Sequence, residues 1–180
     1  MNSGFYIIMA AQFFSSLADN ALLVAAIALL IQMQTPEWMT PLLKFFFTIS
    51  YVLFAAFVGA FADSMAKGRV MFITNMVKIV GCGAMFFHEL LTLPGVQGYL
   101  VVLVAYSIVG LGASAYSPAK YGILTEYLPH HKLVIANGWI EGLTVTSIIL
   151  GTLLGGVLIS HAVSSALLSF DLPVIETGVD

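Results

Sequence analysis

Apolar residues dominate five long stretches of the chain, and short polar segments separate them. The stretches cover residues 5–33, 42–62, 70–93, 98–117 and 133–160. A transmembrane helix needs about 20 mostly apolar residues, so each stretch is long enough to cross a bilayer. Pro41 suits the start of the second helix, and Pro94 and Pro118 are expected to end the third and fourth. The pattern predicts an all-α integral membrane protein with five transmembrane helices, because helices satisfy their own backbone hydrogen bonds in lipid.

The composition agrees with a membrane protein. Of the 180 residues, 60% are hydrophobic and 8% are charged, whereas a soluble domain has roughly 45–50% apolar and about 25% charged residues. The net charge is −3 and no block of like charges occurs, so the sequence offers no nucleic-acid-binding surface. Cys82 is the single cysteine, which excludes an intrachain disulfide. No basic segment precedes the first apolar stretch, so we expect a retained helix rather than a signal peptide.

The distribution of lysine and arginine predicts the orientation in the membrane. The segments that follow the second and fourth stretches carry the basic residues Lys67, Arg69, Lys120 and Lys132. Cytoplasmic loops are enriched in lysine and arginine, so these two loops and the N-terminus are expected in the cytoplasm. Residues 1–161 would then form the transmembrane domain. Residues 162–180, too short and too polar for a sixth span, would form a periplasmic tail.

Two polar residues interrupt the middle of the first stretch. Asp19 and Asn20 are predicted to lie close to the bilayer midplane, where an ionisable group costs roughly 2.5–3.5 kcal/mol, so they should face a protein or water-filled interior. One hypothesis is a substrate or cation site lined by the carboxylate and the amide. The alternative is an interhelical hydrogen bond that holds the bundle together. The cost of burying a carboxylate favours the first hypothesis.

A lysine and a glutamate lie at similar depths in two other stretches. Lys78 is in the third stretch and Glu141 is in the fifth, each a few turns from the predicted cytoplasmic face. Two arrangements are open for Lys78. Its ammonium can pair with Glu141 in the interior of the bundle, or its long side chain can reach back to the interface near Arg69.

The segment 115–122, AYSPAKYG, contains a proline and a lysine at the end of the fourth stretch. Pro118 lacks a backbone donor and disfavours helical geometry for the residue before it. One interpretation is a plain helix end with an interfacial lysine. The other is a binding site for an anionic head group, with Lys120 as its point charge.

Glycine and histidine spacings limit the packing and the chemistry. Two GxxxG pairs in the fifth stretch, Gly138 with Gly142 and Gly151 with Gly155, predict a closely packed helix. The adjacent His130 and His131 have no third ligand nearby, so no metal site is predicted. None of the four histidines has an aspartate five residues later. A membrane-embedded acyltransferase with a histidine general base is therefore not supported.

The turn between the second and third stretches, residues 59–70, reads GAFADSMAKGRV and resembles the signature loop of the major facilitator superfamily. That loop joins the second and third helices on the cytoplasmic side. The residues that fit it are Gly59, Asp63, Lys67 and Arg69. Ser64 stands where an arginine is usual, and Ala66 stands where a glycine is usual. The resemblance implies that the four matching residues control conformation and lie outside the substrate site.

Three further stretches narrow the resemblance. AQFFSSLADNALL at 11–23, AYSPAKYGIL at 115–124 and ANGWIEG at 136–142 are similar to the bacterial lysophospholipid transporter family. The resemblance implies a fold of two six-helix halves in the bacterial inner membrane. This chain resembles the N-terminal half without its sixth helix.

The function that this resemblance implies is transport without enzymatic activity and without a cofactor. Lysophospholipid, chiefly lysophosphatidylethanolamine, would move by alternating access to the cytoplasmic leaflet for reacylation. Asp19 and Asn20 would form the polar part of the site, and Lys120 would attract the phosphate. The implied partners are membrane lipids and the acyltransferase/acyl-carrier-protein synthetase. Two alternatives remain: a transporter of another small molecule with Asp19 as its proton site, and a non-transporting membrane subunit.

Overall fold

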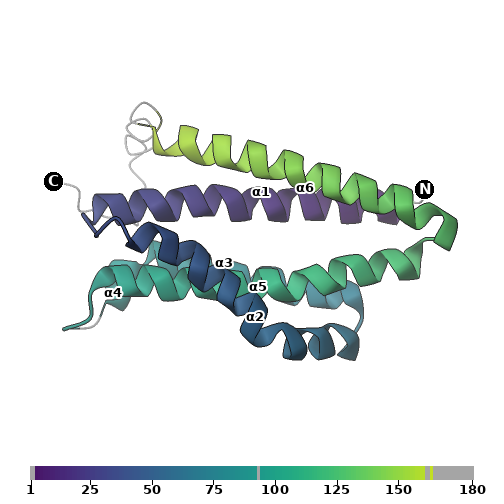
Figure 1. The fold of residues 1–180 in the computed structure, drawn as a ribbon, viewed down its shortest axis with the longest axis horizontal. Helices are drawn as coiled ribbons and strands as arrows, with labels where there is room; N and C mark the ends of the chain where they lie inside the picture. Colours follow the sequence, from purple (N-terminus) through teal and green to yellow (C-terminus); the bar gives the residue numbers. More distant parts are fainter. Residues whose placement is uncertain (1–2, 93, 161–162, 164–180) are drawn as a thin grey trace, which may run out of the picture.

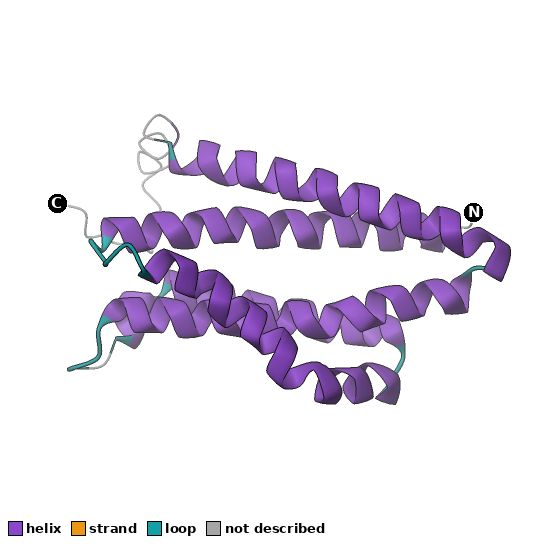
Figure 2. Cartoon of the chain, viewed as in Figure 1, coloured by secondary structure: helices purple, strands orange, loops and turns teal. Residues whose placement is uncertain are grey.

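The computed structural model describes residues 3–92, 94–160 and 163, and nearly all of them are helical (Figure 1). The helices are α1 (Ser3–Gln32), α2 (Met39–Ser64), α3 (Lys67–Phe86), α4 (His88–Leu91), α5 (Gly98–Tyr127) and α6 (His130–Ile159). Figure 2 shows helices and loops but no strand in this described part. The prediction of an all-α protein is confirmed. The predicted tail, residues 162–180, lies outside the described residues except for Val163.

Four helices are long and apolar enough to cross a membrane, and a fifth is bent. The four are α1, α3, α5 and α6. In α2, the segments Met39–Phe54 and Phe57–Ser64 meet at 68°, and the bend is visible in Figure 1. If this bent pair is one span, the number of candidate spans among the described residues rises from four to the predicted five.

The prediction that Pro118 ends the fourth span is wrong, because α5 continues through it to Tyr127. A proline removes only its own backbone donor, and neighbouring helices compensate for that loss in membrane helices. Here the turns after the proline are buried. Ala119, Ile123 and Leu124 belong to an apolar cluster with residues of α1, α3 and α6. Burial of this face keeps the last turns helical.

Two other helix ends differ from the prediction by a few residues. α3 ends at Phe86 because Phe87 leaves helical geometry, with φ −93° and ψ 27°, and the single turn α4 follows. The predicted third span, 70–93, therefore covers two helices. α6 starts at His130, directly after the extended Pro129 and three residues before the predicted start at 133. A proline is a natural boundary, since the residue after it can begin a new helix.

The long helices form two groups. α5 packs between α2 and α3, and α1 packs along α6. Successive long helices run in opposite directions, so the N-terminus of α1, the α2–α3 turn and the α5–α6 turn lie at one end (Figure 1). The basic residues Lys67, Arg69 and Lys132 belong to these turns or follow them directly. This arrangement brings together the loops that the sequence assigned to one side of the membrane.

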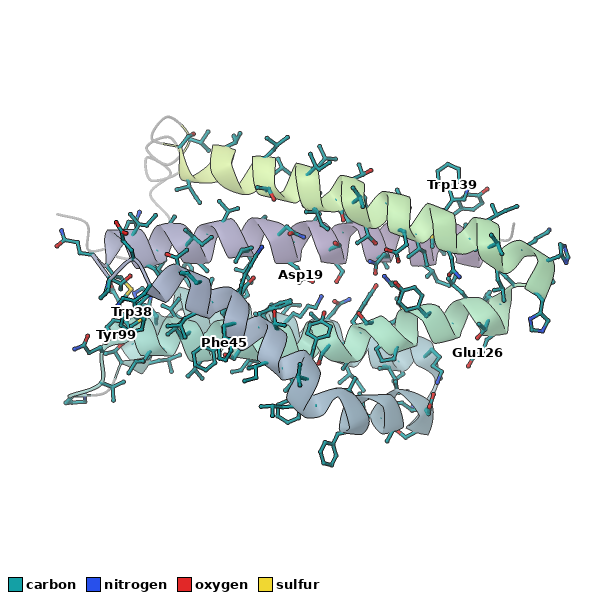
Figure 3. All side chains as sticks on the ribbon, viewed as in Figure 1. Asp19, Trp38, Phe45, Tyr99, Glu126 and Trp139 are labelled. Atoms are coloured by element: carbon teal, nitrogen blue, oxygen red, sulfur yellow. The ribbon has the colours of Figure 1, made fainter. Side chains whose placement is uncertain are left out.

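Aromatic residues mark the two ends of the bundle. Trp38 and Tyr99 lie near one end, and Trp139 lies towards the other, with Asp19 between them (Figure 3). Trp38 and Trp139 are 61% and 60% exposed. Tryptophan and tyrosine are enriched at both membrane–water interfaces, so this distribution fits helices that cross a bilayer.

Two apolar clusters fill the interior. The cluster near the α2–α3 turn includes Phe5, Met71, Tyr116, Leu124 and Ile140. The cluster near the opposite end includes Leu30, Leu43, Met85, Val102 and Tyr106. On α1, α3 and α5 these clusters are separated by a few turns, and Asp19 and Lys78 lie in that interval. The interior therefore has an apolar part at each end and a polar layer between.

Glycines allow α6 to approach α1 closely, but only along part of its length. A Cβ atom at Gly155 would lie 2.8 Å from Cβ of Val24, and one at Gly151 would collide with the carbonyl oxygen of Leu17. The close packing predicted for this pair is confirmed. Gly138 and Gly142 have no such neighbour within 4 Å among the described residues, so the packing predicted for the first pair is not found in that part of the chain.

Candidate functional site: a polar layer in the bundle

The polar layer is built around an ion pair between α1 and α3. Nζ of Lys78 lies 2.5 Å from Oδ2 of Asp19, and it also donates a hydrogen bond of 3.0 Å to Oγ of Ser15. The ammonium lies 5.1 Å from the centre of the Tyr116 ring. Lys78 is 8% exposed. A lysine buried in this way needs a negative partner, and Asp19 supplies it.

The predicted pair of Lys78 with Glu141 is wrong. Lys78 pairs with Asp19, and Glu141 lies within 3.7 Å of Lys120. The reason is the packing order, since α6 packs on α1 while α3 packs on α5. Similar depth in the membrane is not enough when two helices are not neighbours. The alternative of a snorkelling Lys78 is also wrong, because its ammonium is held inside the bundle.

Further side chains extend the ion pair into a network. Ser15 donates to Oδ1 of Asn75 over 3.0 Å, so Asp19, Lys78, Ser15 and Asn75 form one chain of polar contacts. One turn before Ser15 on α1, Nε2 of Gln12 donates to Oγ1 of Thr144 on α6 over 3.1 Å. The network therefore ties α1 to both α3 and α6.

A second ion pair links α5 to α6. Nζ of Lys120 lies 3.7 Å from Oε1 of Glu141, and the Tyr121 hydroxyl donates to the same oxygen over 2.5 Å. The Lys120 ammonium also lies 4.4 Å from the centre of the Tyr121 ring. The side chain of Lys120 is 7% exposed and that of Glu141 is 54% exposed. The lysine is thus the interior member of this pair, and the glutamate lies at its outer edge.

The two lysines and Asp19 line one small polar pocket. Its volume is about 140 Å³, and its other walls include Gln12, Ser15, Tyr51, Tyr116, Ser117 and Thr144. A cavity needs about 10–15 Å³ of such volume to hold one water molecule, so the pocket has room for a small polar group. With two ammonium groups and one carboxylate, it is suited to an anion or to a zwitterion.

Larger pockets meet this polar layer at Asp19. One of about 720 Å³ lies between α1 and α3, and apart from Asp19, Ser15, Asn75 and Lys78 its walls are apolar or sulfur-containing. A third pocket of about 370 Å³ is lined by Asp19, Asn20, Lys44, Tyr51 and Tyr106, among others. Asp19 therefore stands where a polar and an apolar compartment meet.

The structure brings most of the predicted site residues together. Asp19 and Lys120 line the small polar pocket, and Asp19 and Asn20 line the third one. The amide of Asn20 donates to the carbonyl of Ser16 over 2.8 Å, so its NH₂ group already has a partner within α1. Of the three predicted substrate-binding residues, Asp19 and Lys120 are the two that line the small polar pocket.

Several polar residues of the layer were missed by the sequence analysis. They are Gln12, Ser15, Asn75, Tyr116 and Thr144. A signal for those on α1 was present, because Gln12, Ser15 and Asp19 recur at spacings of three and four, which places them on one helix face. The same signal was present on α3 and α5, because Asn75 lies three residues before Lys78 and Tyr116 lies four residues before Lys120. On α6, Thr144 is the one residue that lines the polar pocket, so no spacing marks it.

The signature turn lies apart from this layer. Asp63, near the end of α2, and Lys67, the first residue of α3, form an ion pair of 2.5 Å, and Lys67 also donates to the carbonyl of Ala62. A Cβ atom at Gly122 would lie 3.0 Å from Cε of Lys67, so the lysine stem packs on α5. Arg69 is exposed, and Gly59 has no neighbour within 4 Å of a Cβ position among the described residues.

Comparison with known proteins identifies a family and several similar relatives. The profile described as Major Facilitator Superfamily matches residues 8–174. The chain is 46% identical over 167 residues to the "Lysophospholipid transporter LplT" of Klebsiella pneumoniae, which covers 93% of this chain and 39% of that protein. The protein of the same name from Yersinia enterocolitica is 46% identical over 158 residues, 88% of this chain and 36% of that protein.

The chain thus spans about two fifths of the length of the curated relatives it matches. This coverage is consistent with an N-terminal half. No solved structure matches the chain.

Proposed function

The chain belongs to the major facilitator superfamily, and on that premise we propose that it forms part of a multi-pass transporter of lysophospholipid. The transported lipid would be lysophosphatidylethanolamine, carried across the bacterial inner membrane to the cytoplasmic leaflet by alternating access. There an acyltransferase/acyl-carrier-protein synthetase would restore the second acyl chain. The names of the relatives support this proposal, since proteins 46% identical to this chain are named lysophospholipid transporters.

The observation that carries the proposal is the charge pattern of the polar pocket. Lysophosphatidylethanolamine has a phosphate anion and an ammonium cation in one head group. The pocket has Lys120 for the anion and the carboxylate of the Asp19–Lys78 pair for the cation. Charge-assisted hydrogen bonds are about twice as strong as neutral ones, so such a site favours a zwitterion over a neutral polar molecule.

The neighbouring pocket supports a lipid rather than a sugar or metabolite. Its volume is about 720 Å³, and Phe14, Leu22, Ile79 and Val109 are among its walls. It meets the polar pocket at Asp19 and Lys78, so a head group in one and an acyl chain in the other would belong to one molecule. Lipid tails are as apolar as these side chains, so the acyl chain can stay in apolar surroundings while the head group is bound.

The orientation proposed for the chain has its N-terminus and the α2–α3 and α5–α6 turns in the cytoplasm. The support is the collection of Lys67, Arg69 and Lys132 at one end of the bundle (Figure 1). In this orientation, the apolar cluster that contains Tyr116 lies between the polar layer and the cytoplasm. Asp63, Lys67 and Arg69 would act on the conformational change at that end without touching the lipid.

Lipid transport by the full-length protein tests the proposal. The protein is reconstituted in vesicles with fluorescent lysophosphatidylethanolamine, and protection of the lipid from an impermeant reductant reports its movement. We expect Lys120→Ala to lower the rate about tenfold or more, since it removes a charge-assisted contact with the phosphate. Lys132→Ala is the matched control, because Lys132 is exposed at the same end of the bundle.

Normal transport by a correctly inserted Lys120→Ala or Asp19→Ala variant would exclude the proposed roles of these residues. Uptake that follows a pH gradient whichever lipid is present would instead favour a proton-coupled transporter of another molecule. Absence of transport by the full-length protein would favour a non-transporting membrane subunit.

A further inference from the structure

Two polar atoms in the wall of the small polar pocket have no hydrogen-bond partner among the described residues. They are Oε1 of Gln12 and the hydroxyl of Tyr116, on α1 and α5. Gln12 is 5% exposed and Tyr116 is 4% exposed, and both side chains line the pocket of about 140 Å³. Most buried polar atoms in folded proteins have a partner, so two orphans in one pocket wall point to a molecule that supplies the missing contacts.

The hydrogen bonds around Gln12 decide which of its atoms is free. The hydroxyl of Thr144 donates its single proton to the carbonyl of Ile140 over 2.8 Å. It can therefore only accept from Gln12, and the amide nitrogen must face it, at 3.1 Å. This fixes the orientation of the amide and leaves the carbonyl oxygen as the unpaired atom. The missing partner of Gln12 is a donor.

The two orphan atoms together select the chemistry of the missing group. A carboxamide oxygen only accepts, whereas a phenol hydroxyl has a proton to donate. A phosphate oxygen would satisfy Tyr116 but not Gln12. An ammonium would satisfy Gln12 but would leave the proton of Tyr116 unpaired. An alcohol both donates and accepts, so one hydroxyl group can satisfy both atoms.

We propose that Gln12 and Tyr116 bind the free glycerol hydroxyl of the lysophospholipid and make the transporter specific for lipids that have lost one acyl chain. This proposal rests on the proposed function, because it names a group of the same substrate. A phospholipid with two acyl chains carries an ester at that position, which has no proton to donate to Gln12.

The test compares two lipids that differ in one hydroxyl. Lysophosphatidylethanolamine and its 2-deoxy analogue, in which hydrogen replaces the glycerol hydroxyl, compete for the reconstituted full-length protein at equal mole fractions in the membrane. We expect the wild-type protein to prefer the hydroxylated lipid by about tenfold or more, since the analogue leaves two buried polar atoms unpaired. The preference should fall to about twofold or less in Tyr116→Phe and in Gln12→Leu.

The ratio between the two lipids separates recognition from a structural effect. Loss of the Gln12 contact with Thr144 can change stability, but it changes both lipids equally. Tyr116→Phe removes only an oxygen and decides the question if Gln12→Leu fails to fold. Gln32→Leu is the matched control, because it makes the same change at an exposed position of α1 and should keep the wild-type ratio.

Equal affinity of the wild-type protein for the two lipids would overturn this inference and leave the proposed function intact. An unchanged preference in both variants would overturn it as well. Failure of the wild-type protein to bind either lipid would instead refute the proposed function itself.

Discussion

Replacing one member of the Asp19–Lys78 pair should destabilise the bundle more than replacing both. The two side chains are 19% and 10% exposed, and the charged atoms are 2.5 Å apart. Removing one partner of a buried pair leaves an uncompensated charge and costs about 3–5 kcal/mol. We expect the lower end, about 3 kcal/mol for each single variant, because both residues line pockets where water relieves part of that penalty. This corresponds to roughly a hundredfold change in the ratio of folded to unfolded protein.

A double-mutant cycle measures the coupling. Asp19→Ala, Lys78→Ala and the double variant are unfolded reversibly by sodium dodecyl sulfate in mixed micelles, and the fluorescence of the two tryptophans, Trp38 and Trp139, reports the transition. The double variant buries no unpaired charge, so it should lose less than about 3 kcal/mol, which makes its loss smaller than the sum of the single losses by at least about 3 kcal/mol.

The exposed pair of Asp63 and Lys67 is the matched control. Its charged atoms are also 2.5 Å apart, but the side chain of Asp63 is 81% exposed, whereas that of Lys67 is 13% exposed. A pair that water screens on one side contributes about 0.2–1 kcal/mol. If the coupling of Asp19 with Lys78 is no larger than that of this control, burial does not set the strength of the pair and the reasoning is refuted.

Three further predictions concern packing, helix continuity and orientation. Gly151→Ala should lower the free energy of unfolding by about 1–3 kcal/mol, since the new methyl group meets the backbone of α1. Gly142→Ala is the control and should raise the free energy of unfolding by up to about 1 kcal/mol, because its methyl group would contact no described residue. Pro118→Ala should stabilise the protein by up to about 3 kcal/mol because α5 is already continuous there, and a loss of stability would contradict this. In a cysteine-free background, a cysteine at Gln34 should react with an impermeant maleimide from outside intact cells, and one at Ser64 only after permeabilisation; the reverse pattern would refute the proposed orientation.

The fold class could be predicted because it depends on quantities that a sequence carries directly. The length and hydropathy of the apolar stretches require membrane helices. The excess of lysine and arginine in alternate loops predicts an orientation, which stays a prediction. The end of the fourth helix could not be predicted in the same way. A proline has the same local effect on a helix in every protein. The burial of Ala119 and Leu124 that overrides this effect at Pro118 depends on helices distant in the sequence.

The same distinction applies to the candidate site. The position of Asp19 along its helix gave its depth and therefore its interior location. Its partner could not be deduced, because depth does not determine which helices are neighbours. Lys78 and Glu141 have similar predicted depths in the membrane, yet α3 packs on α5 and α6 packs on α1. The unpaired oxygen of Gln12 could not be predicted either, because it depends on the hydrogen bond that the Thr144 hydroxyl donates to the carbonyl of Ile140 in its own helix.

The two lysines of the polar pocket differ in what they can offer a substrate. Lys78 has a close, buried partner in Asp19 and a second acceptor in Ser15, so its donors are largely engaged within the protein. Lys120 lies 3.7 Å from a glutamate that is half exposed and that also accepts from Tyr121. Water screens such a rim contact, so giving it up costs little. A phosphate in the pocket therefore competes more easily for Lys120 than for Lys78. The first lysine holds the helices together, and the second is the one left to bind the anion.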